Sequence, residues 1–198
     1  LVTIDNEPSR LEALDEFAIA RGFADRLRPF YGVDQADRAR VAAIVDEALG
    51  DAPADLVIDD ASHAYGPTRA SFETLFPRLR PGGRYVIEDW EADIAMVDAV
   101  RIALADPSSP QHQRVKEGLA KGVGTPSPEH ANRVPLARLI VELVVLAGGQ
   151  SGAVADIEVN KSFVSVTRGD VELDLEGFRL DDYGVHGHKL LIERPPEF

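Results

Sequence analysis

Hydrophobic and polar positions along the first 90 residues switch repeatedly between the short apolar runs of buried strands and the wider spacing of helices. The runs that predict strands are residues 1–4, 26–33, 55–60 and 84–89. The segments with apolar residues at helical intervals are residues 11–22, 37–50 and 69–79. Strands that alternate with helices at this spacing form a parallel sheet with right-handed crossovers. The pattern therefore predicts an α/β fold.

The second half of the chain has a different pattern. Residues 91–133 are rich in Pro, Ser, Gly and His, and such a long, weakly patterned stretch predicts a lid or an insertion. Order resumes with a strongly apolar helix at residues 134–149. The tail predicts strands at residues 153–160, 162–169, 171–180 and 188–195, with an antiparallel pair around the short connection at Asn160 and Lys161. We expect one domain over residues 1–198, with residues 170–198 as a C-terminal strand extension.

Composition narrows the classes of function. A chain of 198 residues with a net charge of -13 fits one domain and argues against a nucleic-acid partner, since phosphate binding rests on Lys and Arg. Without cysteine, any metal site must use oxygen or imidazole donors. No stretch approaches the roughly 20 apolar residues of a membrane span, and no secretion signal begins the chain. We expect a soluble, cytoplasmic protein; the composition does not decide whether it forms a homo-oligomer.

The N-terminus is unusual. The chain opens LVTIDNEPSR without an initiator Met, and residues 1–4 already have the character of a buried strand. We therefore expect a segment upstream of the given sequence.

Two predicted strands end in paired carboxylates. Asp59 and Asp60 close DLVIDD, and Glu88 and Asp89 close RYVIED. The carboxyl ends of parallel strands meet at the rim where ligands of open α/β sheets bind. Clustered carboxylates repel one another unless a cation relieves them, and Mg²⁺ prefers such oxygen donors. The alternative is that these acids are solvated or lie at helix N-termini, where the helix dipole favours negative charge.

Two further segments are candidates for cofactor binding. Asp5 ends the first strand, where an acid in nucleotide-binding folds accepts hydrogen bonds from ribose hydroxyls; the alternative is an Asx turn before Pro8. At the end of the next strand, Val33, Asp34 and Gln35 are candidates to bracket an adenine ring. No glycine-rich loop precedes Asp5.

Histidines supply the candidate acid-base groups. His63 lies four residues beyond Asp59, where it can remove a proton from a hydroxyl near neutral pH, and Asp60 competes for that role. His186 and His188 have a spacing that suits a metal, but no third ligand is near them in the sequence.

The motifs VTIDNEP, VIDDASH and PGGRYVIEDW together resemble the class I S-adenosylmethionine-dependent methyltransferases. They are more similar to the metal-dependent O-methyltransferases, and the combination of IDDASH with IEDW is most like the branch that methylates macrolide sugars. The resemblance covers residues 1–90 and, more loosely, residues 153–169. It implies a Rossmann-like sheet, mostly parallel with antiparallel C-terminal strands and with helices on both faces. The family's first strand and glycine-rich loop are missing from this sequence.

The resemblance also implies roles for single residues. Asp5 would hold the ribose of S-adenosylmethionine, and the adenine would lie at Val33, Asp34 and Gln35. The implied ligands of Mg²⁺ are Asp59, Glu88 and Asp89, of which Asp59 also borders the cofactor. Asp60 or His63 would lie beside the acceptor and take its proton.

The implied function is Mg²⁺-dependent O-methylation of a hydroxyl on a small molecule, with a sugar of a natural product as the expected acceptor. Catechol-type methylation is the alternative within the family. A nicotinamide-dependent oxidoreductase is disfavoured by the clustered acids and by the lack of a Tyr-x-x-x-Lys pair. A non-catalytic relative that binds a ligand or a partner is the alternative outside enzymes.

Overall fold

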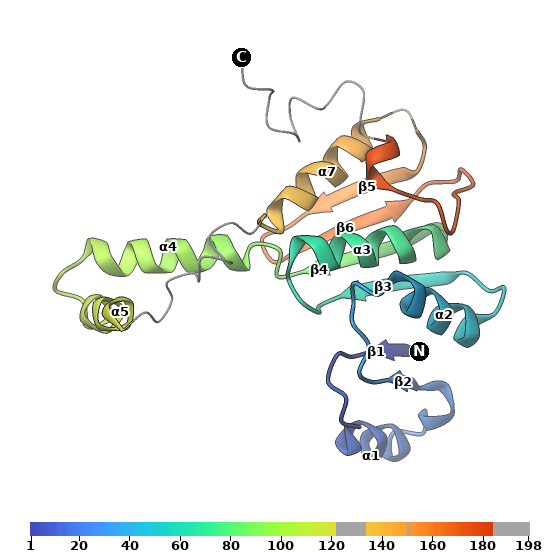
Figure 1. Ribbon diagram of the computed structural model, residues 1–198, viewed down its shortest axis with the longest axis horizontal. Coiled ribbons are helices and arrows are strands. Elements are labelled where there is room, and N and C mark those ends of the chain that lie inside the picture. Colours follow the sequence, from blue (N-terminus) through green and yellow to red (C-terminus); the bar gives the residue numbers. More distant parts are fainter. Residues whose placement is uncertain (122–133, 150, 184–198) are drawn as a thin grey trace.

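The computed structural model describes residues 1–121, 134–149 and 151–183. Its main body is a four-stranded sheet in the order β3-β4-β6-β5 (Figure 1). These strands are β3 (Ala54–Asp59), β4 (Leu79–Glu88), β5 (Val154–Val159) and β6 (Phe163–Arg168). β3 and β4 are parallel, whereas β6 runs antiparallel to both β4 and β5. The predicted α/β fold and its antiparallel C-terminal strand pair are confirmed.

A second, two-stranded parallel ladder joins β1 (Val2–Ile4) to β2 (Arg28–Phe30). The helices are α1 (Glu12–Ala20), α2 (Arg38–Leu49), α3 (Tyr65–Leu75), α4 (Ala92–Ala105), α5 (Pro110–Ala120) and α7 (Ala137–Gly148). Short 3₁₀ turns follow α1 at Ala24–Arg26 and α3 at Phe76–Arg78. Among the described helices, none is both long enough and apolar enough to cross a membrane.

Local sequence explains where the helices of the main body begin and end. The side chain of Asp37 caps α2 by accepting from the backbone N–H of Arg40, and Gly50 ends that helix with a φ of 59°. α3 begins at Tyr65, four residues before the predicted segment, because Pro67 is tolerated in a first helical turn. Because of this early start, only residues 60–64 separate the end of β3 from the first turn of α3.

One face of the four-stranded sheet carries the core. Tyr85 and Ile87 of β4 are fully buried, and the aromatic rings of Phe72 on α3 and Phe76 in the following 3₁₀ turn stack with their centroids 4.6 Å apart. α7 adds the apolar stripe Leu139, Ile140, Leu143 and Leu146 to the same cluster. On the opposite face, Leu56 and Ile58 of β3 are more than half exposed. The helices of the main body therefore cover one face of the sheet, and alternate side chains of β3 and β4 point into the core on that face.

The structure corrects the prediction for two segments. Residues 92–120 form α4 and α5, which project from the main body (Figure 1), where the sequence pattern indicated no element. Ser109 caps α5 and Pro110 occupies its first turn, so residues interpreted as loop formers instead begin a helix. Residues 171–180 do not form the predicted strand; Asp174 accepts from the backbone N–H of Glu176 in an Asx turn. The strand predicted at residues 188–195 lies outside the described residues.

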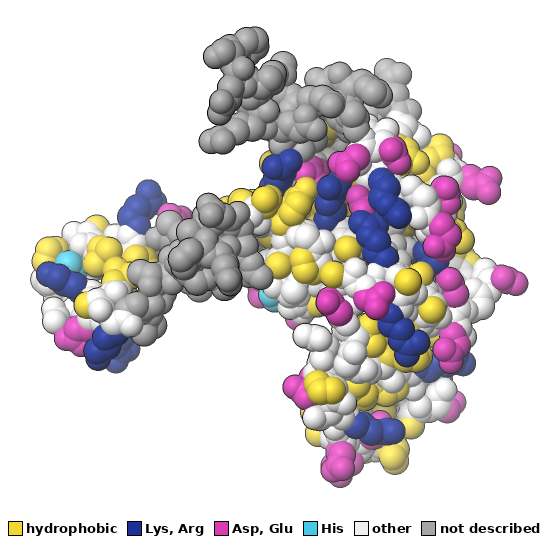
Figure 2. Space-filling view, viewed as in Figure 1, with side chains coloured by type: hydrophobic (Ala, Val, Ile, Leu, Met, Phe, Trp, Pro, Cys, Tyr) yellow, Lys and Arg dark blue, Asp and Glu magenta, His cyan; other side chains and the backbone are white. Residues whose placement is uncertain are grey.

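Charged side chains of both signs cover the surface. On the face shown in Figure 2, acidic and basic groups are interspersed over the main body, and neither sign forms a continuous area. Some of them pair across elements, as Arg69 does with Asp181 and Arg80 with Asp55. On this face the negative charge is thus not gathered into one area.

Arg78 connects three parts of the main body through its guanidinium. Its side chain is only 6% exposed and donates to the carboxylates of Asp46 on α2 and Glu176 in the C-terminal segment. It also donates to the backbone carbonyls of Thr74 and Leu175. A single buried side chain thus satisfies acceptors on α2, α3 and the segment after β6.

We expect Arg78→Met to lower the free energy of unfolding by about 2 kcal/mol, because it removes several charge-assisted hydrogen bonds and leaves the carbonyl of buried Thr74 without this donor. Arg80→Met is the matched control, since its ion pair with Asp55 is half exposed or more on both sides; we expect a change within about 0.5 kcal/mol. Urea unfolding followed by circular dichroism measures both. Equal, small effects would contradict the role of Arg78.

Candidate active site at the ends of β3 and β4

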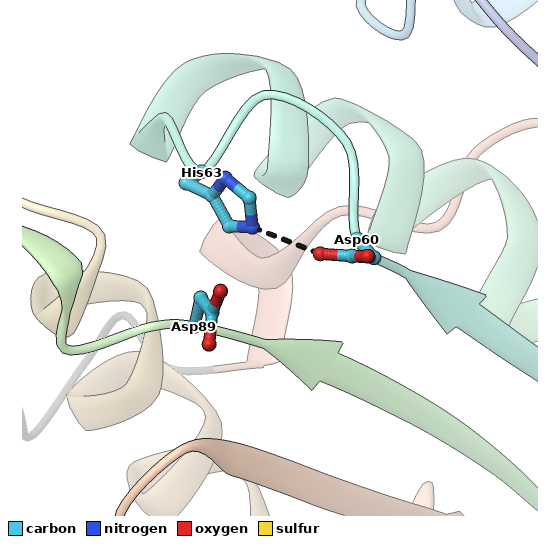
Figure 3. A group of neighbouring side chains, drawn as sticks. All are labelled: Asp60, His63 and Asp89. Carbon is cyan, nitrogen blue, oxygen red and sulfur yellow. Dashed lines mark hydrogen bonds and ion pairs between the residues drawn. The ribbon is translucent and has the colours of Figure 1, made fainter.

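The ends of β3 and β4 bring three chemically active side chains together. The parallel register pairs Asp59 of β3 with Ile87 of β4, so the residues that follow both strands meet at one rim. Ligand atoms of Asp60, His63 and Asp89 all lie within 4.8 Å of one another. Figure 3 shows these three side chains side by side. Asp60 and Asp89 follow the ends of their strands, and His63 lies in the loop that leads into α3. The predicted adjacency of the two acidic strand ends is confirmed.

Within this cluster, the imidazole of His63 contacts one carboxylate directly. Its Nε2 atom is 3.1 Å from Oδ1 of Asp60, and the two side chains are 32% and 58% exposed. Because an ionised carboxylate only accepts, this contact places the proton of a neutral ring on Nε2 and leaves Nδ1 as the basic nitrogen. Across the described part of the chain, neither Asp60 nor Asp89 pairs with Lys or Arg. The two carboxylates are therefore open to a cation.

The backbone at this rim is strained. His63 has a φ of 50° and Asp89 a φ of 48°, and they are the only non-glycine residues in the described ranges with a positive φ. The left-handed region is unfavourable for a side chain with a Cβ atom, and such residues concentrate at functional sites. The strain thus falls on two of the three residues of the cluster.

Asp59 lies one residue before the cluster and points the other way. It is 6% exposed, and its two oxygens accept from Nε2 of Gln35 at 2.6 and 2.8 Å. The hydroxyl of Tyr85 donates to Oδ2 at 2.6 Å. Burial raises the pKa of Asp59, while hydrogen bonds from Tyr85, Ser71, Ala61 and Gln35 oppose the rise. The geometry favours Asp60 over Asp59 as the carboxylate of β3 that faces a metal ion.

Glu88, the other predicted metal ligand, is the last residue of β4 and pairs with Phe163 of β6. Strand alternation puts its side chain on the face of Val86, opposite that of Ile87. It does not belong to the group of Asp60, His63 and Asp89. Its role as a ligand stays a prediction.

The predicted cofactor-binding residues lie at the ends of β1 and β2. Asp5 forms the Asx turn, with Oδ1 accepting from the N–H of Glu7, and its carbonyl accepts from the N–H of Val33. Val33 is buried in the core, whereas Asp34 is exposed and accepts from the N–H of Ala36. Asp5 and Asp34 therefore both follow the carboxyl ends of the two strands. Their roles in binding ribose and adenine stay predictions.

The sequence argument missed Ser62 and Tyr85. Ser62 donates through its hydroxyl to Oε1 of Gln35, and Tyr85 holds Asp59 from the buried face of β4. Alternation along β4 turns Tyr85 inward with Ile87, and a buried phenol needs a hydrogen-bond partner. That signal could have located the Tyr85 contact, whereas the contact of Ser62 depends on the loop conformation. Of the other histidines, His112 lies on α5, and His186 and His188 lie outside the described residues.

Comparison with known proteins identifies the segment that holds this cluster. Residues 1–90 match the sequence profile of a family described as a methyltransferase domain. The matched residues include β1 to β4 and all three residues of the cluster. The resemblance inferred from the IDDASH and IEDW motifs is confirmed.

Curated relatives of this chain are named as O-methyltransferases that act on natural products. The chain is 52% identical over 56 residues to the 8-demethyl-8-alpha-L-rhamnosyl tetracenomycin-C 2'-O-methyltransferase of Streptomyces olivaceus, a match of 28% of this chain and 14% of the relative. It is 61% identical over 41 residues to the mycinamicin VI 2''-O-methyltransferase of Micromonospora griseorubida, which is 20% of this chain and 10% of the relative. The matches thus span less than a fifth of these relatives.

Among solved structures, the MycE methyltransferase from the mycinamycin pathway, in complex with Mg and SAH, matches with a TM-score of 0.49 and 24% identity. The match covers 94% of this chain and 38% of that chain.

Proposed function

We propose that this chain is part of an S-adenosylmethionine-dependent O-methyltransferase that uses Mg²⁺ and acts on a hydroxyl of a small molecule. The observation that carries the proposal is the cluster of Asp60, His63 and Asp89 at the rim of a methyltransferase domain. Clustered carboxylates beside an imidazole supply what O-methylation needs: a site for a divalent cation and a base.

The donor set fits a divalent cation. Asp60 and Asp89 contribute carboxylate oxygens from two adjacent loops, both are exposed, and their repulsion is not relieved by a basic side chain of the described residues. Oxygen donors with room for water and a substrate oxygen suit Mg²⁺. When bound, Mg²⁺ supplies positive charge to a developing alkoxide and S-adenosylmethionine supplies the electrophilic methyl group.

The residues of the chain divide the remaining work. Asp60 holds the Nε2 proton of His63, so that Nδ1 can accept the proton of the acceptor hydroxyl. Asp5 borders the cofactor at the end of β1, and Val33 and Asp34 border it at the end of β2. The fixed left-handed backbone at His63 and Asp89 keeps the imidazole and the carboxylate facing each other.

We infer that the acceptor is a sugar hydroxyl of a natural product. Two of the curated relatives act on a rhamnosyl tetracenomycin and on mycinamicin VI, according to their names. The acceptor assignment therefore rests on these relatives.

Calorimetric titration with S-adenosylhomocysteine, in Mg²⁺ and in excess EDTA, tests the cofactor and the metal together. We expect Mg²⁺ to bind to the protein in the absence of S-adenosylhomocysteine. In a separate rate measurement, we expect EDTA to abolish methyl transfer to an alpha-L-rhamnosyl glycoside. Transfer that persists at full rate in EDTA would contradict the metal. Lack of binding by both Mg²⁺ and S-adenosylhomocysteine would favour a non-catalytic relative.

A further inference from the structure

A chain of hydrogen bonds runs from the core to the loop of the cluster. The hydroxyls of Ser71 and Tyr85 lie 2.8 Å apart, Tyr85 donates to Asp59, and Asp59 accepts from Gln35. The other end of the Gln35 amide meets Ser62, whose hydroxyl donates to Oε1 at 2.7 Å and whose backbone N–H donates at 3.3 Å. The chain begins at buried Ser71 and ends at exposed Ser62, between Asp60 and His63.

The orientation of the Gln35 amide is determined from both sides. The carboxylate of Asp59 is an acceptor only, so it must face the NH₂ group. The backbone N–H of Ser62 is a donor only, so it must face the carbonyl oxygen. Both polar ends of the side chain are therefore engaged by the protein, which leaves the amide poorly placed to read an adenine ring.

The loop that Gln35 grips is short and strained. His63 keeps its left-handed backbone directly after Ser62, and α3 begins two residues later at Tyr65. A strained conformation persists only where surrounding contacts hold it. Among the described contacts of Ser62, the two to Gln35 tie the loop to a different strand end, 27 residues earlier in the chain.

We propose that Gln35 is a positioning residue: it links the buried Asp59 carboxylate to Ser62 and so holds Asp60 and His63 in the geometry that binds the divalent cation. This inference rests on the proposed function, because it assigns Gln35 to the same metal site. Residues that orient metal ligands contribute about 10- to 100-fold to metal affinity. Gln35 acts through Ser62 and does not touch the cation.

A Mn²⁺ titration followed by electron paramagnetic resonance tests the link. We expect Gln35→Leu and Ser62→Ala each to weaken Mn²⁺ binding about tenfold. The double variant is expected to be no weaker than Gln35→Leu alone, because both changes break the same connection. Gln113→Leu on α5 is the matched control, since among the described residues its amide pairs with the exposed Glu117, and it is expected to bind as the wild type does.

A reversal of polarity provides a rescue. Gln35→Glu places a carboxylate against Asp59 and is expected to weaken Mn²⁺ binding, whereas Gln35→Glu combined with Asp59→Asn restores a donor and an acceptor and is expected to recover most of it. A structural role alone would not show this pattern. Thermal unfolding of each variant establishes that it is folded at the temperature of the titration, and Ser62→Ala, at an exposed position, keeps the test open if Gln35→Leu does not fold.

Wild-type Mn²⁺ affinity in Gln35→Leu would overturn the inference. So would losses of Mn²⁺ affinity in Gln35→Leu and Ser62→Ala that add in the double variant, or a Gln35→Glu/Asp59→Asn variant that binds Mn²⁺ as weakly as Gln35→Glu. Failure of the wild type itself to bind Mn²⁺ would instead overturn the metal site of the proposed function. The two failures are therefore distinguishable in one titration series.

Discussion

Asp89→Asn is expected to remove most divalent-cation binding and to slow methyl transfer by about a thousandfold. The neutral amide keeps the size of the side chain and tolerates the left-handed backbone at this position. What it loses is one of the two negative charges that face the cation. Metal assistance provides several kcal/mol of transition-state stabilisation, and each 1.4 kcal/mol is about tenfold in rate. Mn²⁺ titration and transfer to an alpha-L-rhamnosyl glycoside measure the two effects separately.

Three companion variants locate the metal ligands around Asp89. Asp60→Asn is expected to have a similar effect, because Asp60 lies in the same cluster. Glu88→Gln tests the metal ligand that the sequence predicted but that lies outside the cluster. A large loss of cation binding in this variant would show that Glu88 is a ligand. Asp156→Asn, at an exposed position on β5, is the matched control and is expected to change neither quantity. Full metal binding by both Asp89→Asn and Asp60→Asn would contradict the site.

His63→Gln is expected to lower turnover by about 10²- to 10⁴-fold, the usual contribution of a positioned general base. Affinity for S-adenosylhomocysteine is expected to be unchanged, because the imidazole does not lie at the ends of β1 and β2. Steady-state rates and calorimetry on the same variant separate catalysis from binding.

The controls for His63 decide between two roles of the imidazole. If His63 is a base, Mn²⁺ affinity stays close to that of the wild type; if it is a ligand, affinity falls together with turnover. His112→Gln on α5 is the matched histidine control and is expected to be silent. Unchanged turnover in His63→Gln would remove this residue from the mechanism.

The sequence predicted the rim correctly because the relevant information is local. Apolar runs that end in acid define where β3 and β4 stop, and the alternation of strands with helices makes those strands parallel neighbours. Asp60 and Asp89 then had to lie close together. Pattern and chain connectivity were sufficient for this part of the site.

The division of roles between Asp59 and Asp60 was harder to predict. Successive residues of a strand point to opposite faces, so one position decides between the core and the open rim. Asp59 shares the inward face of Val57, and only the distant partners Gln35 and Tyr85 make burial of its carboxylate acceptable. Those contacts join residues 24 and 26 positions apart. Local pattern does not contain that information.

The projecting helices were missed for a different reason. α4 and α5 contact each other more than they contact the main body. Ser109 and Pro110 were interpreted as loop formers although the same pair begins helices well. Conversely, residues 171–180 alternate in sequence but pair with no strand of the sheet in the described structure.

The strained backbone at His63 and Asp89 lowers the stability of the fold at the two positions whose side chains we propose for the chemistry. Left-handed residues with side chains cost of the order of 1–3 kcal/mol each, a large share of the 5–15 kcal/mol by which a typical domain is stable. Glycine at either position would relieve the strain and delete the imidazole or the carboxylate in one change. Selection for a more stable fold would therefore favour glycine at these two positions, whereas selection for the proposed activity would favour histidine and aspartate.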